Sequence, residues 1–414
     1  MMRRTARECA VLVLAATTAA CGARAGAPTP VTARATQWFT TWATSNQEPV
    51  RNPADSIDRR PIFANRTVRQ IAHVSIGGTS VRVRFTNEYG NQPLVIGAAH
   101  VALGANASTI LPASDHAITF GGRASVTLRP GAMIVSDAVP LAVPQLSDLV
   151  ITTFVRDSIR LVTRHTLATQ TNYVSRSGDY TSAPTIAIDT TITGWVWLAG
   201  VDVMSPSATG VIVTLGNSIT DGFNSTRSMN RRWPDVLAQR LLTSGEPPKG
   251  IANAGISGNR VLSPGTGPSA LARFDRDVLA QPGVTHLIIL EGINDIGRAP
   301  EPVTADEIIH GLHQLADRAH ERGIVVFGAT LTPAGPRPAF TPEMEAKRLA
   351  VNAWIRGSGV FDGVIDFDAA TRDPADPKQM QKAYDSGDHL HPGDAGYKAM
   401  GDAIDLAIFR RTRP

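Results

Sequence analysis

Five short apolar runs alternate with helix-forming segments in the second half of this chain. The runs are Val211–Leu215, Gly250–Ile256, Leu287–Leu290, Ile324–Gly328 and Val364–Phe367. An uninterrupted apolar run predicts a strand that is buried on both faces, and strands that alternate with helices predict a parallel sheet between two helical layers. We therefore expect residues 207–414 to form a flavodoxin-like three-layer α/β/α domain with a five-stranded parallel sheet.

The helix predicted most clearly in this half spans Thr304–His320. Its apolar residues fall on one face: Ile308, Ile309, Leu312, Leu315, Ala316 and Ala319. Thr304 and Glu307 have the spacing of a capping box. A second helix is expected to open at Thr341-Pro342, because proline suits the first helical position, and a last one is expected over Ala395–Arg410.

The segment from about Trp38 to Met204 follows a different pattern. In Val81–Phe85 apolar and basic residues alternate, which predicts a half-buried strand. Gly77-Gly78 stands just before it and predicts a turn that pairs this strand with Val68–Ile76. No helical period of useful length occurs, so we expect residues 36–205 to form an all-β, jelly-roll-type sandwich domain, with Ser205-Pro206-Ser207 as the hinge.

The first 25 residues have the layout of a secretory signal peptide. Three arginines precede the apolar run Ala10–Ala20, which is about half the length of a membrane-spanning helix. Two endings are open: a lipoprotein signal that ends before Cys21, which would carry the lipid, or cleavage after Ala23-Arg24-Ala25. Cys9 is removed in both cases, so no internal disulfide is expected. The protein is predicted to be exported, either secreted or lipid-anchored in the cell envelope; in the second case the lipid on Cys21 would be its one contact with a membrane.

Overall composition excludes several other classes. Of the 414 residues, 43% are hydrophobic and 18% are charged, which is ordinary for a globular protein. The net charge of +4 is small and dispersed, so no nucleic-acid partner is expected.

Polar segments follow the predicted strands at the edge where their carboxyl ends meet. They are Gly216–Gly222, Asn253–Asn259, Glu291–Asp295 and, ahead of the last helix, Asp388–Pro392. Together these segments resemble the four blocks of the SGNH/GDSL hydrolase family, over residues 211–406. The preceding β region resembles the N-terminal sandwich of one branch of that family. The resemblance implies a serine esterase without a cofactor, and an oxyanion hole built from Ser218, Gly258 and Asn294.

Three of these residues predict nucleophilic catalysis on chemical grounds. The hydroxyl of Ser218 needs an adjacent base to accept its proton, and His391 is that base. Asp388 stands three residues before His391, close enough to hold its second ring nitrogen. Ser218, Asp388 and His391 are therefore the predicted catalytic residues.

Two other hydrolase mechanisms fit the sequence less well. An α/β-hydrolase needs Gly-x-Ser-x-Gly, and Thr220 occupies the last of these positions. A metal hydrolase would use Asp388, His389 and His391 as ligands, but no His-x-x-x-His or acidic partner segment accompanies them. We expect no metal, and we expect His389 to be structural or to hydrogen-bond at the rim of the site.

Two residues beside the predicted site leave questions open. Asn217 stands where the family commonly has aspartate, so activity is expected and its pH dependence stays open. Glu291 has two readings, a buried carboxylate with a raised pKa or a salt bridge to an arginine such as Arg260.

The predicted function is an exported serine ester hydrolase that cleaves short-chain or O-acetyl esters through an acyl-enzyme, on a small-molecule or polysaccharide substrate. A lipase, arylesterase or thioesterase is the alternative within the same chemistry. An alternative of another class is a glycan-binding module with an inactive hydrolase-like domain. The segment around His165 and Tyr173 is either a plain surface loop or a wall of the substrate site.

Overall fold

The parallel sheet expected in the second half is present in the computed structural model. The structure describes residues 37–49, 63–159, 161–335, 337 and 339–413. The sheet has the order β16-β15-β17-β18-β19, and every neighbouring pair is parallel. Its strands are β15 (Val211–Gly216), β16 (Gly250–Gly255), β17 (Val284–Leu290), β18 (Val325–Ala329) and β19 (Gly363–Ile365). This order confirms the flavodoxin-like prediction.

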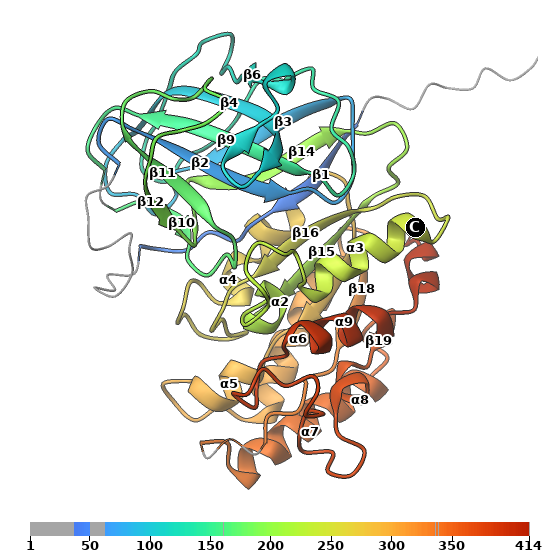
Figure 1. Ribbon diagram of the computed structural model, residues 1–414. Helices are drawn as coiled ribbons and strands as arrows, with labels where there is room; N and C mark the ends of the chain where they lie inside the picture. Colours follow the sequence, from blue (N-terminus) through green and yellow to red (C-terminus); the bar gives the residue numbers. More distant parts are fainter. Residues whose placement is uncertain (1–36, 50–62, 160, 336, 338, 414) are drawn as a thin grey trace, which may run out of the picture. The chain divides into compact units, whose positions relative to one another are not determined.

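Helices cover the two faces of this sheet (Figure 1). One group comprises α3 (Trp233–Thr243), α8 (Phe367–Thr371) and α9 (Asp394–Ala403), which contact one another. The second comprises α4 (Ala270–Phe274), α5 (Ile293–Arg298), α6 (Ala305–His320) and α7 (Pro342–Gly357). All six residues of β15 are buried, as expected for a strand between two helical layers.

The helix ends follow the capping signals in the sequence, with one exception. Thr304 Oγ1 accepts from the backbone of Glu307, and the Glu307 carboxylate accepts from the backbone of Thr304, which confirms the capping box of α6. The single helix expected over Ala395–Arg410 is instead α9 followed by a 3₁₀ turn over Leu406–Arg410. Arg240 donates to the carbonyl oxygens of Gly401, in the last turn of α9, and of Ile404, the residue after it, so both carbonyls have a partner outside the helix.

Antiparallel sheets make up the region before residue 205, as predicted. One sheet has the order β1-β14-β3-β8, with β1 (Trp38–Ala43), β14 (Leu198–Met204), β3 (Ser80–Thr86) and β8 (Met133–Val135). The larger sheet has the order β12-β11-β2-β9-β4-β5, with β6 (His116–Ala117) and β7 (Val126–Leu128) also paired to β4. Its other strands are β12 (Ile188–Ile192), β11 (Asn172–Ser177), β2 (Arg66–His73), β9 (Asp148–Val155), β4 (Leu94–Asn106) and β5 (Thr109–Ile110). A short pair joins β10 (Arg164–His165) to β13 (Trp195–Val196).

The hairpin expected at Gly77-Gly78 is wrong. Strand β2 pairs with β9 and β11, whereas β3 pairs with β14 and β8 in the other sheet. The glycines serve close packing instead, because a Cβ at Gly77 would lie 2.4 Å from the carbonyl oxygen of Val143. The chain therefore crosses between the sheets where a tight turn was predicted.

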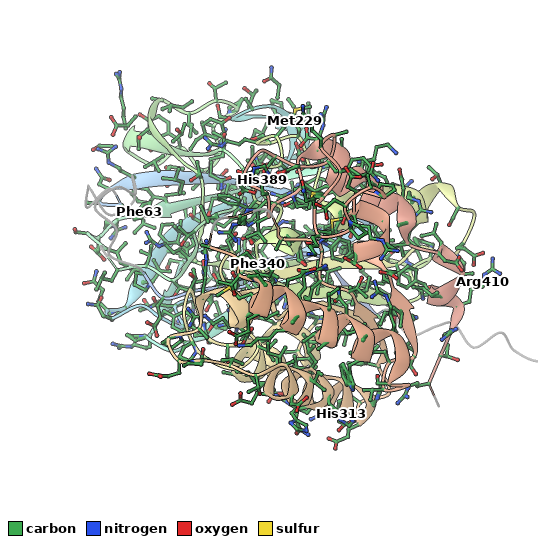
Figure 2. All side chains as sticks on the ribbon, turned by 90° about the horizontal axis from the view of Figure 1, so that it is seen from below. Phe63, Met229, His313, Phe340, His389 and Arg410 are labelled. Atoms are coloured by element: carbon green, nitrogen blue, oxygen red, sulfur yellow. The ribbon has the colours of Figure 1, made fainter. Side chains whose placement is uncertain are left out.

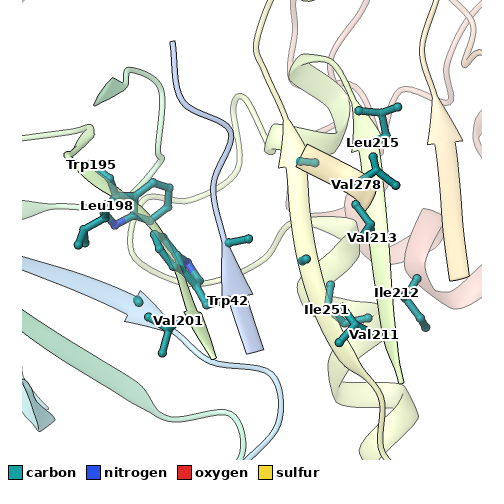
Figure 3. Close-up of a cluster of buried hydrophobic side chains, with 14 of the residues drawn as sticks. Trp42, Trp195, Leu198, Val201, Val211, Ile212, Val213, Leu215, Ile251 and Val278 are labelled. Carbon is teal, nitrogen blue, oxygen red and sulfur yellow. The ribbon is translucent and has the colours of Figure 1, made fainter. Parts of the chain in front are cut away.

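The sandwich packs directly on the parallel sheet, and the described residues from 37 onward form one compact unit. Figure 3 shows side chains of both regions in a single hydrophobic core, among them Trp42 and Trp195 from the sandwich and Ile251 from β16. The carbonyl oxygen of Thr40 lies so near Gly250 that a Cβ there would be 2.1 Å away. The backbone N–H of Ile251 also donates to Ser75 Oγ at 2.9 Å.

Within the described ranges, every helix is too short or too polar to cross a bilayer. The predicted signal peptide, with Cys9 and Cys21, lies outside the described residues.

Candidate active site

Ser218 is the first residue of α2 (Ser218–Asp221), a single helical turn that follows the carboxyl end of β15. Asn217 caps this turn, because its side-chain oxygen accepts from the backbone N–H of Ile219 at 3.0 Å. Gly222 ends the turn in the left-handed region, with φ of 91°. This local geometry places the Ser218 hydroxyl at the edge of the sheet where the other polar segments gather.

The structure brings Ser218, His391 and Asp388 into one hydrogen-bonded chain. Ser218 Oγ lies 2.8 Å from His391 Nε2, and His391 Nδ1 lies 2.6 Å from Asp388 Oδ2. A carboxylate accepts hydrogen bonds only, so Nδ1 carries the proton of the neutral ring and Nε2 is free to accept from the serine. The arrangement is that of a nucleophile, a base and an orienting acid.

The loop around Asp388 holds its carboxylate before any substrate binds. Asp388 Oδ1 accepts from the backbone N–H groups of Leu390 and His391 at 3.0 and 2.8 Å. Partial burial opposes the charge, but these bonds and the His391 side chain lower the pKa of Asp388. Burial lowers the pKa of His391, against the opposing effect of Asp388, and the charges of Arg298 and Arg337 lower it further. His391 therefore stays neutral, as a base must, at a pH where an ordinary histidine is partly protonated.

Gly258 and Asn294, the other two expected oxyanion donors, follow the carboxyl ends of β16 and β17, the two neighbours of β15. Gly258 has φ of 83°, a conformation that favours glycine, on the loop after β16. Asn294 lies in the first turn of α5 and donates one amide hydrogen to the Asn259 carbonyl at 2.9 Å, which leaves its second hydrogen free to donate. In the described part of the chain, the backbone N–H groups of Ser218 and Gly258 donate to no protein acceptor. Such unpaired donors suit a developing oxyanion.

Asn217 and Glu291 form a buried pair that sequence reasoning did not identify. Asn217 Nδ2 donates to Glu291 Oε2 at 2.9 Å, and Glu291 is 1% exposed. Burial raises the pKa of Glu291 to about 8, and the charge of Asp295 adds to the shift while Arg273 opposes it. Arg260 donates instead to the Pro264 and Arg298 carbonyls, so the expected salt bridge is absent from the described contacts and the raised-pKa reading holds.

His389 stands apart from the hydrogen-bonded chain. Its Nδ1 lies 2.6 Å from Asp385 Oδ2, and its side chain is 47% exposed on the surface (Figure 2). Its partner therefore lies within its own loop, and it makes no contact with Ser218. Among the residues that the structure describes, no cluster of three or more metal-ligating side chains occurs.

The two readings of the segment around His165 and Tyr173, a plain surface loop or a wall of the substrate site, both assume exposed side chains, and His165 is buried. His165 is 2% exposed and bonds to Asp221 at 2.9 Å, behind the nucleophile turn. Tyr173 packs on a separate small cluster with Ile71 and Val150. No periodicity marks the two-residue strand of His165, so its link to Asp221 had no local signal.

Comparison with known proteins finds similarity over the α/β region. Residues 214–399 match the model of the GDSL-like lipase/acylhydrolase family. No curated protein matches the chain. Solved structures similar to it include a lipase/acylhydrolase from Enterococcus faecalis, with 23% identity over 50% of this chain and 98% of the other, and a TM-score of 0.40. A GDSL-like lipase from Bacteroides thetaiotaomicron shares 22% identity over 49% and 89% of the two chains, with a TM-score of 0.38.

Proposed function

We propose that this protein is a serine ester hydrolase that works through a covalent acyl-enzyme, because residues 214–399 match the model of the GDSL-like lipase/acylhydrolase family. The observation that carries the proposal is the chain of short contacts from Ser218 Oγ to His391 Nε2 and from His391 Nδ1 to Asp388 Oδ2, at 2.8 and 2.6 Å. An inert scaffold has no need of this arrangement.

The first half-reaction transfers the acyl group to Ser218. Ser218 Oγ attacks the ester carbonyl carbon while its proton moves to His391 Nε2. The imidazolium is stabilised by Asp388, which remains ionised. The carbonyl oxygen becomes an oxyanion, and the N–H groups of Ser218 and Gly258 and the amide of Asn294 donate to it. The intermediate collapses, the bond to the alcohol oxygen breaks, and the alcohol leaves with the proton from His391.

The second half-reaction regenerates the serine. His391 takes a proton from a water molecule, whose oxygen attacks the acyl carbon of the ester on Ser218. The same donors stabilise the second oxyanion. Its collapse breaks the bond to Ser218 Oγ, His391 returns the proton, and the carboxylic acid is released.

The substrate that we propose is a short-chain or O-acetyl ester, on a small molecule or a polysaccharide, and we propose that the enzyme is exported. The signal-like layout of residues 1–25 supports export, as a secreted protein or with a lipid on Cys21. An exported esterase with an attached β-sandwich suits cell-envelope or extracellular polysaccharides, an association at the level of the fold.

A chain-length series of p-nitrophenyl esters, with acetylated xylan and pectin beside it, tests the proposal. The full-length protein should hydrolyse the acetate fastest, and Ser218→Ala should lose the activity while melting at the same temperature. A serine-reactive organophosphonate should label the native protein at Ser218 only. Turnover in Ser218→Ala near that of the native protein would overturn the mechanism, and a preference for long acyl chains would replace the proposed substrate by a lipid ester.

A further inference from the structure

His165, a residue of the sandwich, hydrogen-bonds to the helical turn that begins at Ser218. His165 Nε2 lies 2.9 Å from Asp221 Oδ1, and His165 Nδ1 lies 2.8 Å from the carbonyl oxygen of Ser45. Asp221 is the last residue of α2, the turn that begins at Ser218. His165 and Asp221 are 2% and 4% exposed, so water does not separate the two charges. The sandwich thus contributes a buried partner to the proposed catalytic machinery.

The surroundings of His165 select its doubly protonated form. Both ring nitrogens face acceptors that have no proton to give, a carbonyl and a carboxylate, so two N–H groups are needed to satisfy them. Burial opposes the charge, but the charge of Asp221 and the bonds to Asp221 and Ser45 raise the pKa of His165. The ring also lies against Trp195, with centroids 5.7 Å apart.

Other charged groups near this pair already have partners. Arg232, whose charge opposes that of His165, donates to the Asp221 backbone oxygen at 3.0 Å and pairs with Asp235 at 3.2 Å. His73 and Asp235 line the same small cavity as His165. Tyr397 of α9 stays neutral, because burial, and then the charge of Asp221, raise its pKa well above the ordinary value. Asp221 is therefore the acid that pairs with His165.

Asp221 also bonds to the loop that carries Ser257 and Gly258. Its Oδ2 accepts from the backbone N–H of Ser257 at 3.0 Å and from Ser257 Oγ at 2.7 Å. Ser257 directly precedes Gly258, whose N–H is a proposed oxyanion donor. The end of β16, just before this loop, also packs closely on α2, because a Cβ at Gly255 would lie 2.4 Å from the Asp221 backbone nitrogen.

Ser45 links the sandwich to the same loops by a second route. Its hydroxyl accepts from Arg273 Nη1 at 3.0 Å, while its carbonyl accepts from His165. The buried guanidinium of Arg273 also donates to the Gly216 carbonyl at 3.0 Å and to Asn259 Oδ1 at 3.0 Å. Gly216 and Asn259 flank the nucleophile and the hole, so two sandwich residues support both loops.

We propose that His165 is a positioning residue of the esterase: its imidazolium, through Asp221, holds Ser257 and Gly258 in the orientation that the oxyanion requires. The inference rests on the proposed function. A misplaced donor weakens the transition state more than the bound ester, so loss of His165 should lower kcat and leave KM nearly unchanged.

The same arrangement sets the alkaline side of the pH profile. When His165 loses a proton, one of its ring nitrogens can no longer donate, and the ring loses its hydrogen bond to either Asp221 or the Ser45 carbonyl. Activity should therefore fall as the pH rises through the raised pKa of His165, and it should fall on the acid side as His391, with its lowered pKa, becomes protonated.

The test measures kcat and KM for p-nitrophenyl acetate between pH 5 and 9 on the full chain. His165→Gln keeps a donor to Asp221 that does not titrate, so it should lower kcat roughly tenfold and remove the alkaline limb. His165→Ala should lower kcat roughly ten- to hundredfold, which is less than the loss of a whole oxyanion donor. The matched control is His100→Gln, because His100 pairs with Asp115 at 2.9 Å within the sandwich. It should behave as the native enzyme.

A second measurement follows the protonation of His165 without relying on enzyme activity. Imidazole NMR of the native chain should show one histidine, absent from His165→Gln, that stays doubly protonated above pH 6.5. A native kcat and alkaline limb in His165→Gln, or titration of His165 below that pH, would overturn the proposal while the esterase stands. A native protein without Ser218-dependent turnover would instead refute the proposed function.

Discussion

The side-chain amide of Asn217 donates to the buried carboxyl of Glu291 at 2.9 Å, one residue before the nucleophile. Glu291 Oε1, its other oxygen, has no partner among the described residues and is shielded from solvent. A carboxylate in that position would be costly, and the raised pKa of about 8 keeps the group neutral at pH 7. Asn217 is the residue type that fits, because an aspartate there would place a second acid against the first.

Glu291→Gln should change how stability depends on pH. Unfolding lets Glu291 return to its ordinary pKa, so between about pH 4.5 and pH 8 the native protein holds a proton that the unfolded chain releases. Its stability should fall as the pH rises through that interval, by at most about 1.4 kcal/mol per pH unit from this group. Denaturant unfolding at pH 5, 6, 7 and 8 should show that the free energy of unfolding of the variant, relative to that of the native protein, increases with pH. The control is the exposed Glu321→Gln, and a difference that is constant with pH would contradict the assignment.

Asn217→Asp should be harmful on its own and tolerated beside Glu291→Gln. Two carboxyl groups in one buried site cannot both ionise cheaply, so the single variant should melt at a lower temperature, most clearly above pH 7, and lose activity there. The double variant lacks one of the two acids, so it should recover most of the native melting temperature and most of the native activity. A single variant as stable and active as the native enzyme at pH 8 would show that the pair is not coupled.

The two histidines of the last loop should differ sharply on substitution. His391→Ala removes the base and should lower kcat about as much as Ser218→Ala, because members of a catalytic unit are not additive. His389→Ala breaks a surface contact with Asp385 and should keep most of the activity. Initial rates on p-nitrophenyl acetate, with and without EDTA, measure both. The opposite ranking, or inactivation by EDTA, would mean a different base or a bound metal.

The two proposed oxyanion donors other than Ser218 can be tested separately. Asn294→Ala removes a side-chain donor and should lower kcat about 10²- to 10³-fold. Gly258→Ala should also be harmful, since φ is 83° there and a Cβ would lie 2.7 Å from Thr266 Oγ1. Gly297→Ala is the matched control, because nothing lies within 4 Å of its Cβ position on α5. Equal activity of the three variants would remove both residues from the hole.

A chain shortened to residues 207–414 should not form a stable enzyme. It would leave the buried N–H of Ile251 without Ser75, remove Glu88 from the half-buried Arg276, which keeps Asp277, and expose the core shared with Trp42. Each orphaned buried polar group costs about 1–3 kcal/mol, against a net stability of only about 5–15 kcal/mol. Circular dichroism and a thermal melt of the fragment measure this. Cooperative unfolding together with full esterase activity would show that the α/β domain is independent.

The sequence predicted the parallel sheet and its polar edge because both have local causes. A strand covered on two faces must be apolar throughout, as Val211–Leu215 is, and the carboxyl ends of parallel strands meet at one edge. The pair Asn217–Glu291 and the contact His165–Asp221 join residues 74 and 56 positions apart, and no local pattern encodes such contacts. The wrong hairpin prediction at Gly77 has the same origin. In the sequence, a glycine that is needed because another backbone segment packs against it cannot be distinguished from a glycine that is needed for a turn.

The loop that carries Asp388 and His391 also has a consequence for the order in which the enzyme is made. Its acid and base are fixed by bonds between residues at most three positions apart, so the catalytic pair needs little beyond its own loop to take shape. His391 follows Ser218 by 173 positions in the chain. A chain interrupted before residue 388 would carry the proposed nucleophile and oxyanion donors but no base. Hydrolytic activity would thus begin only after synthesis has passed His391.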